Sequence, residues 1–145
     1  MGFAEYKLRT HQQYIRLLEV LNPLTAFIEL VPVSPEDDLV VHWALQNMEL
    51  IEQGTESERY KTGDGKPIYT RYLFRWSEAA FRYFGNLHNF YIYVESPAGH
   101  NADVLMETEF AWTDVAFLDE KRNTIFYTIT HEGYAFIQES LREIV

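Results

Sequence analysis

Residues 107–137 read ETEFAWTDVAFLDEKRNTIFYTITHEGYAFI, and this stretch decides the fold that we expect. It holds three runs rich in aromatic and β-branched residues, at 107–119, 124–130 and 134–137. Such residues favour strands, and the polar residues 120–123 between the first two runs predict a turn. The C-terminal part of the chain is therefore predicted to form an antiparallel sheet.

Helical periodicity marks the N-terminal half instead. Apolar residues recur on one helical face over residues 5–21, and Asn22 followed by proline ends this first predicted helix. A second helix is predicted to start at Ser34 as its N-cap, with proline and acids in its first turn. We expect it to end near Gly54, although its apolar middle could also run as a strand.

A third, shorter helix is predicted in the middle of the chain. Ser77 is its expected cap, and Gly85 is its expected end. Glu78 and Arg82 stand four residues apart, so they should form an ion pair along this helix. Residues 139–145 are predicted to add one helical turn at the C-terminal end.

Further strands are expected between these helices. Residues 26–33 lie between prolines and fit an edge strand or an extended linker. The turn residues 61–67, followed by the β-formers of 68–74, predict a hairpin. Residues 90–94 fit a buried strand, and residues 96–101 fit a loop.

Together these elements predict an α+β fold with a mostly antiparallel sheet, two longer N-terminal helices and one short central helix. Helices gather at the front of the chain and strands at the back, which argues against a βαβ repeat. A chain of 145 residues has the size of one globular domain, so we expect a single domain over residues 1–145.

The composition excludes several kinds of chemistry. The chain has no cysteine, which excludes disulfides, thiolate metal sites and a cysteine nucleophile. Neither a signal-peptide pattern nor an uncharged apolar run of about 18 residues is present, so we expect a cytoplasmic protein that does not enter a membrane. No cofactor is expected.

Charge is distributed in blocks along the chain. The formal net charge is -10, and residues 17–58 and 83–120 contain acids but neither lysine nor arginine. A field of this sign repels nucleic acids and attracts cationic proteins, so no nucleic-acid partner is expected. Between the two acidic blocks lies a basic island, made of Arg59, Lys61, Lys66, Arg71, Arg75 and Arg82.

Known catalytic and metal motifs are incomplete in this sequence. The segment around Lys66 lacks the spacing of a phosphate loop, and Ala135 stands where a zinc-binding motif that starts at His131 would need its second histidine. We predict no metal site, and we interpret a looser set of ligand-type residues as a solvated acidic rim; its members are His100, Asp103, Glu107 and Glu109. An acid–base pair between a histidine and a carboxylate stays open, because such pairs leave no spacing in sequence.

Arg71 and Arg75 are the candidate anion-binding residues. They alternate with aromatic residues, and arginine forks bind anions. Pairing of these arginines with the acidic blocks of the same chain is the interpretation that we favour.

The candidate partner-binding residues lie in the run 107–119. As a strand, this run would place Glu107 and Glu109 on one face and Trp112 and Asp114 on the other. That pattern predicts an acidic and aromatic docking surface, although a plain amphipathic strand would show it too.

Our first functional hypothesis is therefore a small acidic module that binds a basic protein, as an inhibitor or an immunity-type protein does. One alternative is an enzyme or small-anion-binding protein with a pocket near Arg71 and Arg75. Another is a structural or regulatory subunit of a homo-oligomer.

Overall fold

The computed structural model describes residues 2–33, 38–61, 67–94 and 104–145. Within these ranges the α-helices are α1 (His11–Leu21), α2 (Leu39–Asn47) and α3 (Glu78–Gly85). The strands of the large sheet are, in spatial order, β1 (Phe3–Glu5), β9 (Tyr134–Gln138), β8 (Thr124–Ile129), β7 (Asp114–Leu118), β2 (Phe27–Val31), β4 (Pro67–Arg75) and β3 (Leu50–Lys61). A small separate sheet pairs β5 (Ile92–Val94) with β6 (Val104–Met106). Short 3₁₀ turns are η1 (Asn22–Leu24), η3 (Thr130–Glu132) and η4 (Glu139–Leu141).

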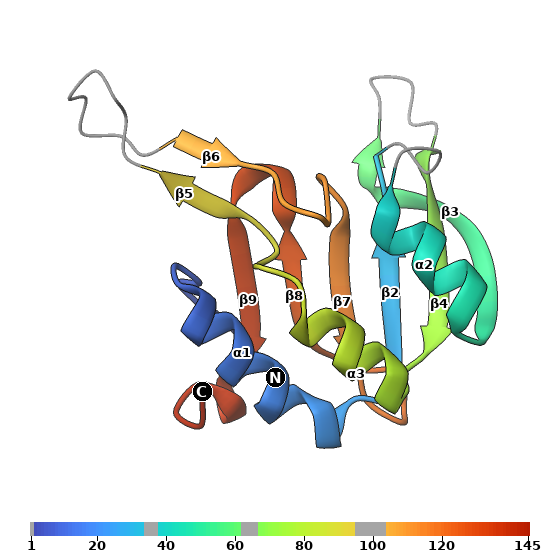
Figure 1. Cartoon of the computed structure of the whole chain (residues 1–145). Coiled ribbons are helices and arrows are strands. Elements are labelled where there is room, and N and C mark those ends of the chain that lie inside the picture. The colour runs from blue at the N-terminus through green and yellow to red at the C-terminus, as the bar shows by residue number, and fades with distance from the viewer. Residues whose placement is uncertain (1, 34–37, 62–66, 95–103) are drawn as a thin grey trace.

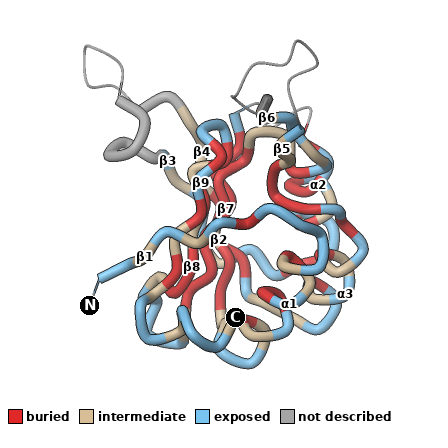
Figure 2. The backbone as a smooth tube through the Cα atoms, turned by 90° about the vertical axis from the view of Figure 1, so that its left-hand side faces the viewer, coloured by how far each residue is buried: buried red, intermediate tan, exposed pale blue. Residues whose placement is uncertain are grey.

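Neighbouring strands of both sheets run antiparallel, which confirms the predicted mixture of helices and a mostly antiparallel sheet. The three helices lie in front of the large sheet in Figure 1. The view from the side shows them all on the same face of the sheet (Figure 2). The described residues thus form two layers, one of helices and one of strands.

The face of the sheet that packs against the helices is apolar from edge to edge. One row of register partners crosses all seven strands on this face: Ala4, Ile137, Phe126, Phe117, Ile28, Phe74 and Leu50. The five inner members of the row have no exposed surface. They share one core with buried residues of all three helices, among them Leu17, Val41 and Phe84.

Hydrogen bonds define the start of α1 and connect this helix to α3 above the core. Thr10 and Gln13 form a capping box at the start of α1, which supplies partners for N–H groups that the helix leaves open. The buried Tyr14 hydroxyl donates to the backbone oxygen of Phe84 at 2.6 Å and so ties α1 to α3. Burial raises the pKa of Tyr14, which keeps this donor protonated.

Several predicted elements agree with the structure. Ser77 accepts from the backbone N–H of Ala80 and caps α3, and Arg82 pairs with Glu78 at 3.3 Å. The hairpin of β3 and β4 and the strands β8 and β9 also lie where they were predicted. The residues of the hairpin turn and the loop 96–101 lie outside the described residues, apart from the turn's two ends.

The helix boundaries are the first correction. Residues Phe3–Glu5 form an edge strand, and α1 begins only at His11 after the Thr10 cap. Helix α2 begins at Leu39 with Asp38 as its cap, and it ends at Asn47, so the second helix is shorter than predicted. The predicted cap Ser34 lies outside the described residues.

The strand predictions need correction at three places. Residues Phe27–Val31 are not an edge strand but lie between β7 and β4. The predicted buried strand 90–94 begins only at Ile92, and its residues are half-buried or exposed. Residues 107–113 form tight turns rather than strand, with Ala111 at a φ of 51°. These turns bring Phe110 into the core against Phe84 and Phe90, and this burial outweighs strand propensity.

No helix within the described ranges has both the length and the apolar character needed to cross a membrane.

Gly133 offers a test of how the small sheet packs on the large one. Its φ of 70° is left-handed, and an added Cβ would overlap the Tyr93 hydroxyl and lie 2.7 Å from Cζ of that ring. We expect Gly133→Ala to lower the free energy of unfolding by about 2 kcal/mol or more in urea denaturation. Gly85→Ala is the control, because a Cβ there meets nothing within 4 Å. Equal stability of both variants would contradict this packing.

Candidate functional site

The second face of the large sheet carries no helix in the described part of the chain (Figure 2). We call it the open face. Its central row of register partners again crosses all seven strands: Glu5, Phe136, Tyr127, Ala116, Glu29, Leu73 and Glu52. A carboxylate stands at each end of this row and another in the middle. This row of the open face therefore mixes acids with aromatic and aliphatic residues, whereas the row described above on the helical face is entirely apolar.

Aromatic rings cover the half of the open face formed by β1, β8 and β9. Tyr127 lies between Phe3 and Phe136, with ring centroids 5.2 and 5.0 Å away, and Tyr134 extends the group beyond Phe136. Phe3 is 36% exposed and Tyr134 is 44% exposed. Large aromatic side chains left at the surface of a sheet are typical of binding surfaces.

Ion pairs occupy the other half of the open face. Arg71 pairs with Glu29 at 3.3 Å and with Glu52 at 2.9 Å, and Arg122 pairs with Glu52 at 3.3 Å. The hydrogen bond from Arg71 lowers the pKa of Glu52. Arg75 pairs with Glu49 at 3.4 Å. The two candidate anion-binding arginines thus each have a carboxylate partner from the first acidic block, which is the pairing that the sequence favoured.

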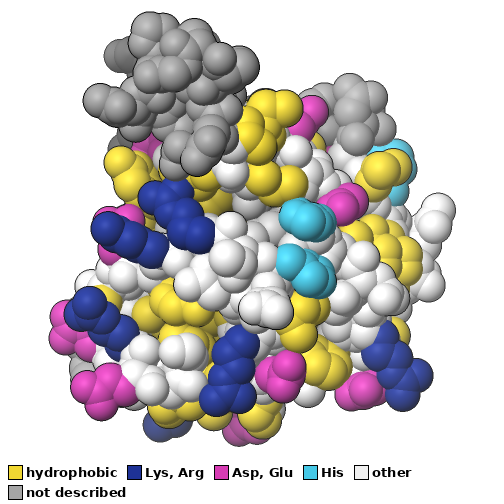
Figure 3. Space-filling view, turned by 60° about the vertical axis from the view of Figure 1, so that its left-hand side comes forward, with side chains coloured by type: hydrophobic (Ala, Val, Ile, Leu, Met, Phe, Trp, Pro, Cys, Tyr) yellow, Lys and Arg dark blue, Asp and Glu magenta, His cyan; other side chains and the backbone are white. Residues whose placement is uncertain are grey.

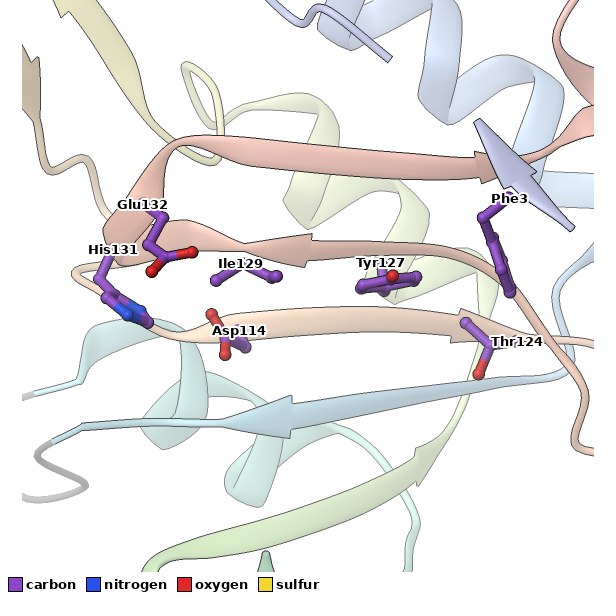
Figure 4. A pocket seen from close by; sticks show the side chains of 7 residues that line it. All are labelled: Phe3, Asp114, Thr124, Tyr127, Ile129, His131 and Glu132. Atoms are coloured by element: carbon purple, nitrogen blue, oxygen red, sulfur yellow. The ribbon is translucent and has the colours of Figure 1, made fainter. Parts of the chain in front are cut away.

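A hollow of about 590 Å³ lies in the aromatic half of the open face, along β8 (Figure 4). We call it the β8 hollow. Its described lining residues are Phe3, Asp114, Thr124, Tyr127, Ile129, His131 and Glu132. An adjoining hollow of about 480 Å³ shares Phe3 and Thr124 with it and continues to Asn123 and Gln138. The two together form a track along β8.

The polar end of the β8 hollow is formed where β7 begins and β8 ends. Figure 4 shows Asp114, His131 and Glu132 gathered at this end, with Tyr127 in the middle and Phe3 and Thr124 at the other end. Asp114 is 1% exposed, and its Oδ1 accepts from the backbone N–H of Thr130 at 2.7 Å. That bond anchors η3 and so holds His131 and Glu132 beside the hollow.

A buried cluster of hydroxyl groups supports this end of the sheet. The Thr130 hydroxyl donates to the backbone oxygen of Thr113 at 2.6 Å and lies 2.7 Å from the Thr128 hydroxyl. The Thr113 hydroxyl in turn donates to Asp38, the cap of α2. Hydrogen bonds therefore connect the floor of the hollow to the start of a helix on the opposite face.

Burial raises the pKa of Asp38, while its hydrogen bonds from Thr113 and from the backbone N–H of Val41 act in the opposite direction. The carboxylate caps α2 at 2.9 Å from the Val41 nitrogen, and Asp38 is 2% exposed. A charged cap in this position is favourable for the helix but unfavourable for burial.

The structure separates the four predicted partner-binding residues. Glu107 is exposed, and Glu109 accepts from the backbone N–H of His88 at 3.3 Å. Glu109 lies on the side of the helices, near enough to Tyr14 to add to the rise of that pKa. Trp112 is half-buried, and only Asp114 lines the β8 hollow.

The hollow also contains residues that sequence reasoning missed. The sequence indicates His131 only as the start of an incomplete zinc motif or as one of several histidines open to an acid–base pair, and it assigns no binding role to Glu132, Tyr127 or Phe3. Alternation along 124–130 could have indicated that Tyr127 and Ile129 share a face, but nothing in the sequence shows which face the helices leave open.

A second group of ionisable residues lies on the helical side. The rings of His11 and His88 stack with centroids 5.3 Å apart, and Glu109 accepts from the backbone N–H of His88. Figure 3 shows histidine side chains at the surface beside acidic ones on the side of the molecule that it views. His11 Nδ1 is 2.7 Å from the backbone oxygen of His88. Within the described residues no group of three or more ligand-type side chains could hold a metal ion. His100 and Asp103 lie outside those residues.

No protein-family model, curated protein or solved structure matches this chain.

Asp38 gives a prediction about pH. Because its pKa is higher in the folded state, its stabilising contribution is complete below the unfolded value of about 3.9 and is lost as pH rises through the folded value. Asp38→Asn keeps an acceptor for the cap and carries no charge. We expect wild-type stability relative to Asp38→Asn to increase as pH falls from 7 to about 4, measured by urea denaturation. Glu120→Gln is the control for loss of one surface charge, and parallel curves for wild type and Asp38→Asn would contradict the prediction.

Proposed function

We propose that this chain is a binding module that docks a basic protein on the open face of its sheet. The observation that carries the proposal is the β8 hollow, which joins carboxylates to aromatic rings in a face that the described helices leave uncovered. Its described lining residues include neither lysine nor arginine. A concave, partly apolar site with a few converging polar groups is the usual form of a binding site.

The charge of the whole chain supports the same kind of partner. With a net charge of -10, the protein attracts cationic surfaces over a distance of about one Debye length, roughly 8 Å at physiological salt. Exposed acids outside the open face contribute to this attraction, and we include Glu107 and Glu109 in the proposal in that role. Such charges speed association more than they strengthen the final complex. Trp112, which is half-buried, is not needed for this proposal.

A module of this kind acts as an inhibitor when it covers the active site or the binding site of its partner. This is the finer form of the proposal, and an immunity-type protein against a basic toxin would be one example. The small size of the chain and its strong negative charge support this form.

The other two hypotheses have less support from the geometry. Arg71 and Arg75 do not line the β8 hollow, and their carboxylate partners reduce what an anion would gain there. Pairing of two copies through the open face would bring together two chains of net charge -10, which repel each other. A basic partner would neither compete with the carboxylates that pair with Arg71 and Arg75 nor be repelled by the negative charge of the chain.

Fluorescence anisotropy with labelled nona-arginine as a defined basic probe tests the proposal. We expect the probe to bind, and binding to weaken steeply as salt rises. Glu5→Lys with Glu132→Lys changes the open face, whereas Glu19→Lys with Glu143→Lys makes the same change of net charge on exposed residues elsewhere. The first pair should weaken binding about tenfold more than the second. Equal loss in both double variants would show attraction to net charge alone and would contradict an open-face site.

A further inference from the structure

We propose that the β8 hollow is an anchor site for one arginine or lysine side chain of the basic partner, whose backbone lies extended along β8. This inference rests on the proposed function and adds the chemistry of its central contact. The charged head would lie at the end formed by Asp114, His131 and Glu132, and the aliphatic stem would lie against Tyr127 and Phe3.

The shape of the hollow fits an extended segment better than a compact ligand. Its lining runs along β8 from Thr124 to Ile129 and on to His131 and Glu132, and the adjoining hollow continues the track past Thr124 to Asn123. A volume of about 590 Å³ lies within the range of pockets that hold drug-sized molecules, which is more room than one side chain fills. The remaining length of the track therefore has room for the residues on either side of the anchor.

The charge of the polar end fits a cation. Glu132 is exposed, and within the described residues its carboxylate takes part in no hydrogen bond or ion pair. Asp114 adds a second carboxylate, almost completely buried, at the same end. A guanidinium can meet carboxylates with two parallel hydrogen bonds, and an ammonium can donate three. An anion placed here would lie beside the exposed Glu132 carboxylate and close to the buried Asp114, with no arginine or lysine among the described lining residues.

The aromatic part of the hollow fits the aliphatic stem that leads to the charged head. The Tyr127 ring is held between Phe3, edge-on at 5.2 Å, and Phe136, stacked at 5.0 Å. Long basic side chains bury their methylene groups on such surfaces while keeping the charge near water, and cations lie favourably over aromatic faces. The chain already makes this contact itself, because the guanidiniums of Arg75 and Arg122 lie 5.2 Å from the centre of the Phe27 ring on the same face.

Two small probes isolate the anchor from the rest of the docking surface. We would titrate ¹⁵N-labelled protein with n-butylguanidinium and, as the uncharged counterpart, with n-butanol, and follow backbone amide shifts by NMR. We expect n-butylguanidinium to shift the amides of Ile129, His131 and Glu132, with a dissociation constant in the millimolar range for so small a ligand. Butanol should leave the amides at the polar end unchanged.

Variants of the two ends separate charge from packing. Glu132→Gln should weaken n-butylguanidinium binding about fivefold to tenfold, and Tyr127→Leu should weaken both n-butylguanidinium and nona-arginine. Glu120→Gln, an exposed acid outside the hollow, is the matched control and should change neither. Should Tyr127→Leu fail to fold, the single-atom change in Glu132→Gln still decides the test.

The results distinguish the anchor from the proposed function. If nona-arginine binds the open face but n-butylguanidinium shifts no amide around the hollow, or Glu132→Gln changes neither affinity, the anchor is wrong and the docking face stands. If n-butylguanidinium binds at the hollow but nona-arginine does not depend on the open-face residues, the hollow is a cation site and the docking proposal is wrong. Shifts spread evenly over the acidic surface would overturn the anchor as well.

Discussion

The structure depends on the burial of one face of an antiparallel sheet. The row from Ile137 to Phe74 is apolar in every strand that it crosses, and the three helices contribute the other half of the same core. Burying one such side chain stabilises the fold by about 1.5–3 kcal/mol, so the row as a whole outweighs local preferences. Because side chains alternate along a strand, the same constraint turns the neighbouring row outward and creates the open face.

The open face is only partly apolar, and its polar groups are arranged rather than scattered. On β2, β4 and β3 the acids meet arginines, so Glu29 and Glu52 contribute little unbalanced charge. In the other half, Tyr127 of β8 lines the same hollow as Asp114 and Glu132, and the described lining contains neither arginine nor lysine. The two halves of the open face therefore differ in charge balance: the acids of one half are paired with arginines, and the β8 hollow in the other half has none in its described lining.

The buried hydroxyl cluster at the ends of β7 and β8 connects the two layers. Thr113, Thr130 and Asp38 join the floor of the hollow to the cap of α2 through hydrogen bonds that lie entirely in the interior. Buried polar networks of this kind rigidify a site when they are satisfied, because an unmade hydrogen bond there is costly. Asp114 belongs to the same arrangement through its hydrogen bond from the backbone N–H of Thr130, which helps to hold this buried side chain at the edge of the β8 hollow.

Sequence by itself determined the mixture of helices and antiparallel strands, the Ser77 cap, the Glu78–Arg82 pair and the hairpin of β3 and β4, because each depends on residues close together in the chain. The sequence also determined the sign of the electrostatic field around the protein, because the net charge is the sum of the residue charges and does not depend on the fold. Tertiary structure alone decided that residues Phe27–Val31 lie inside the sheet and that Phe110 turns into the core instead of continuing a strand. Tertiary structure alone brought Phe3 to Tyr127 and Asp114 to the same hollow as Glu132. Contacts between distant strands depend on which face of the sheet the helices cover, and the spacing of residues along the chain does not indicate that face.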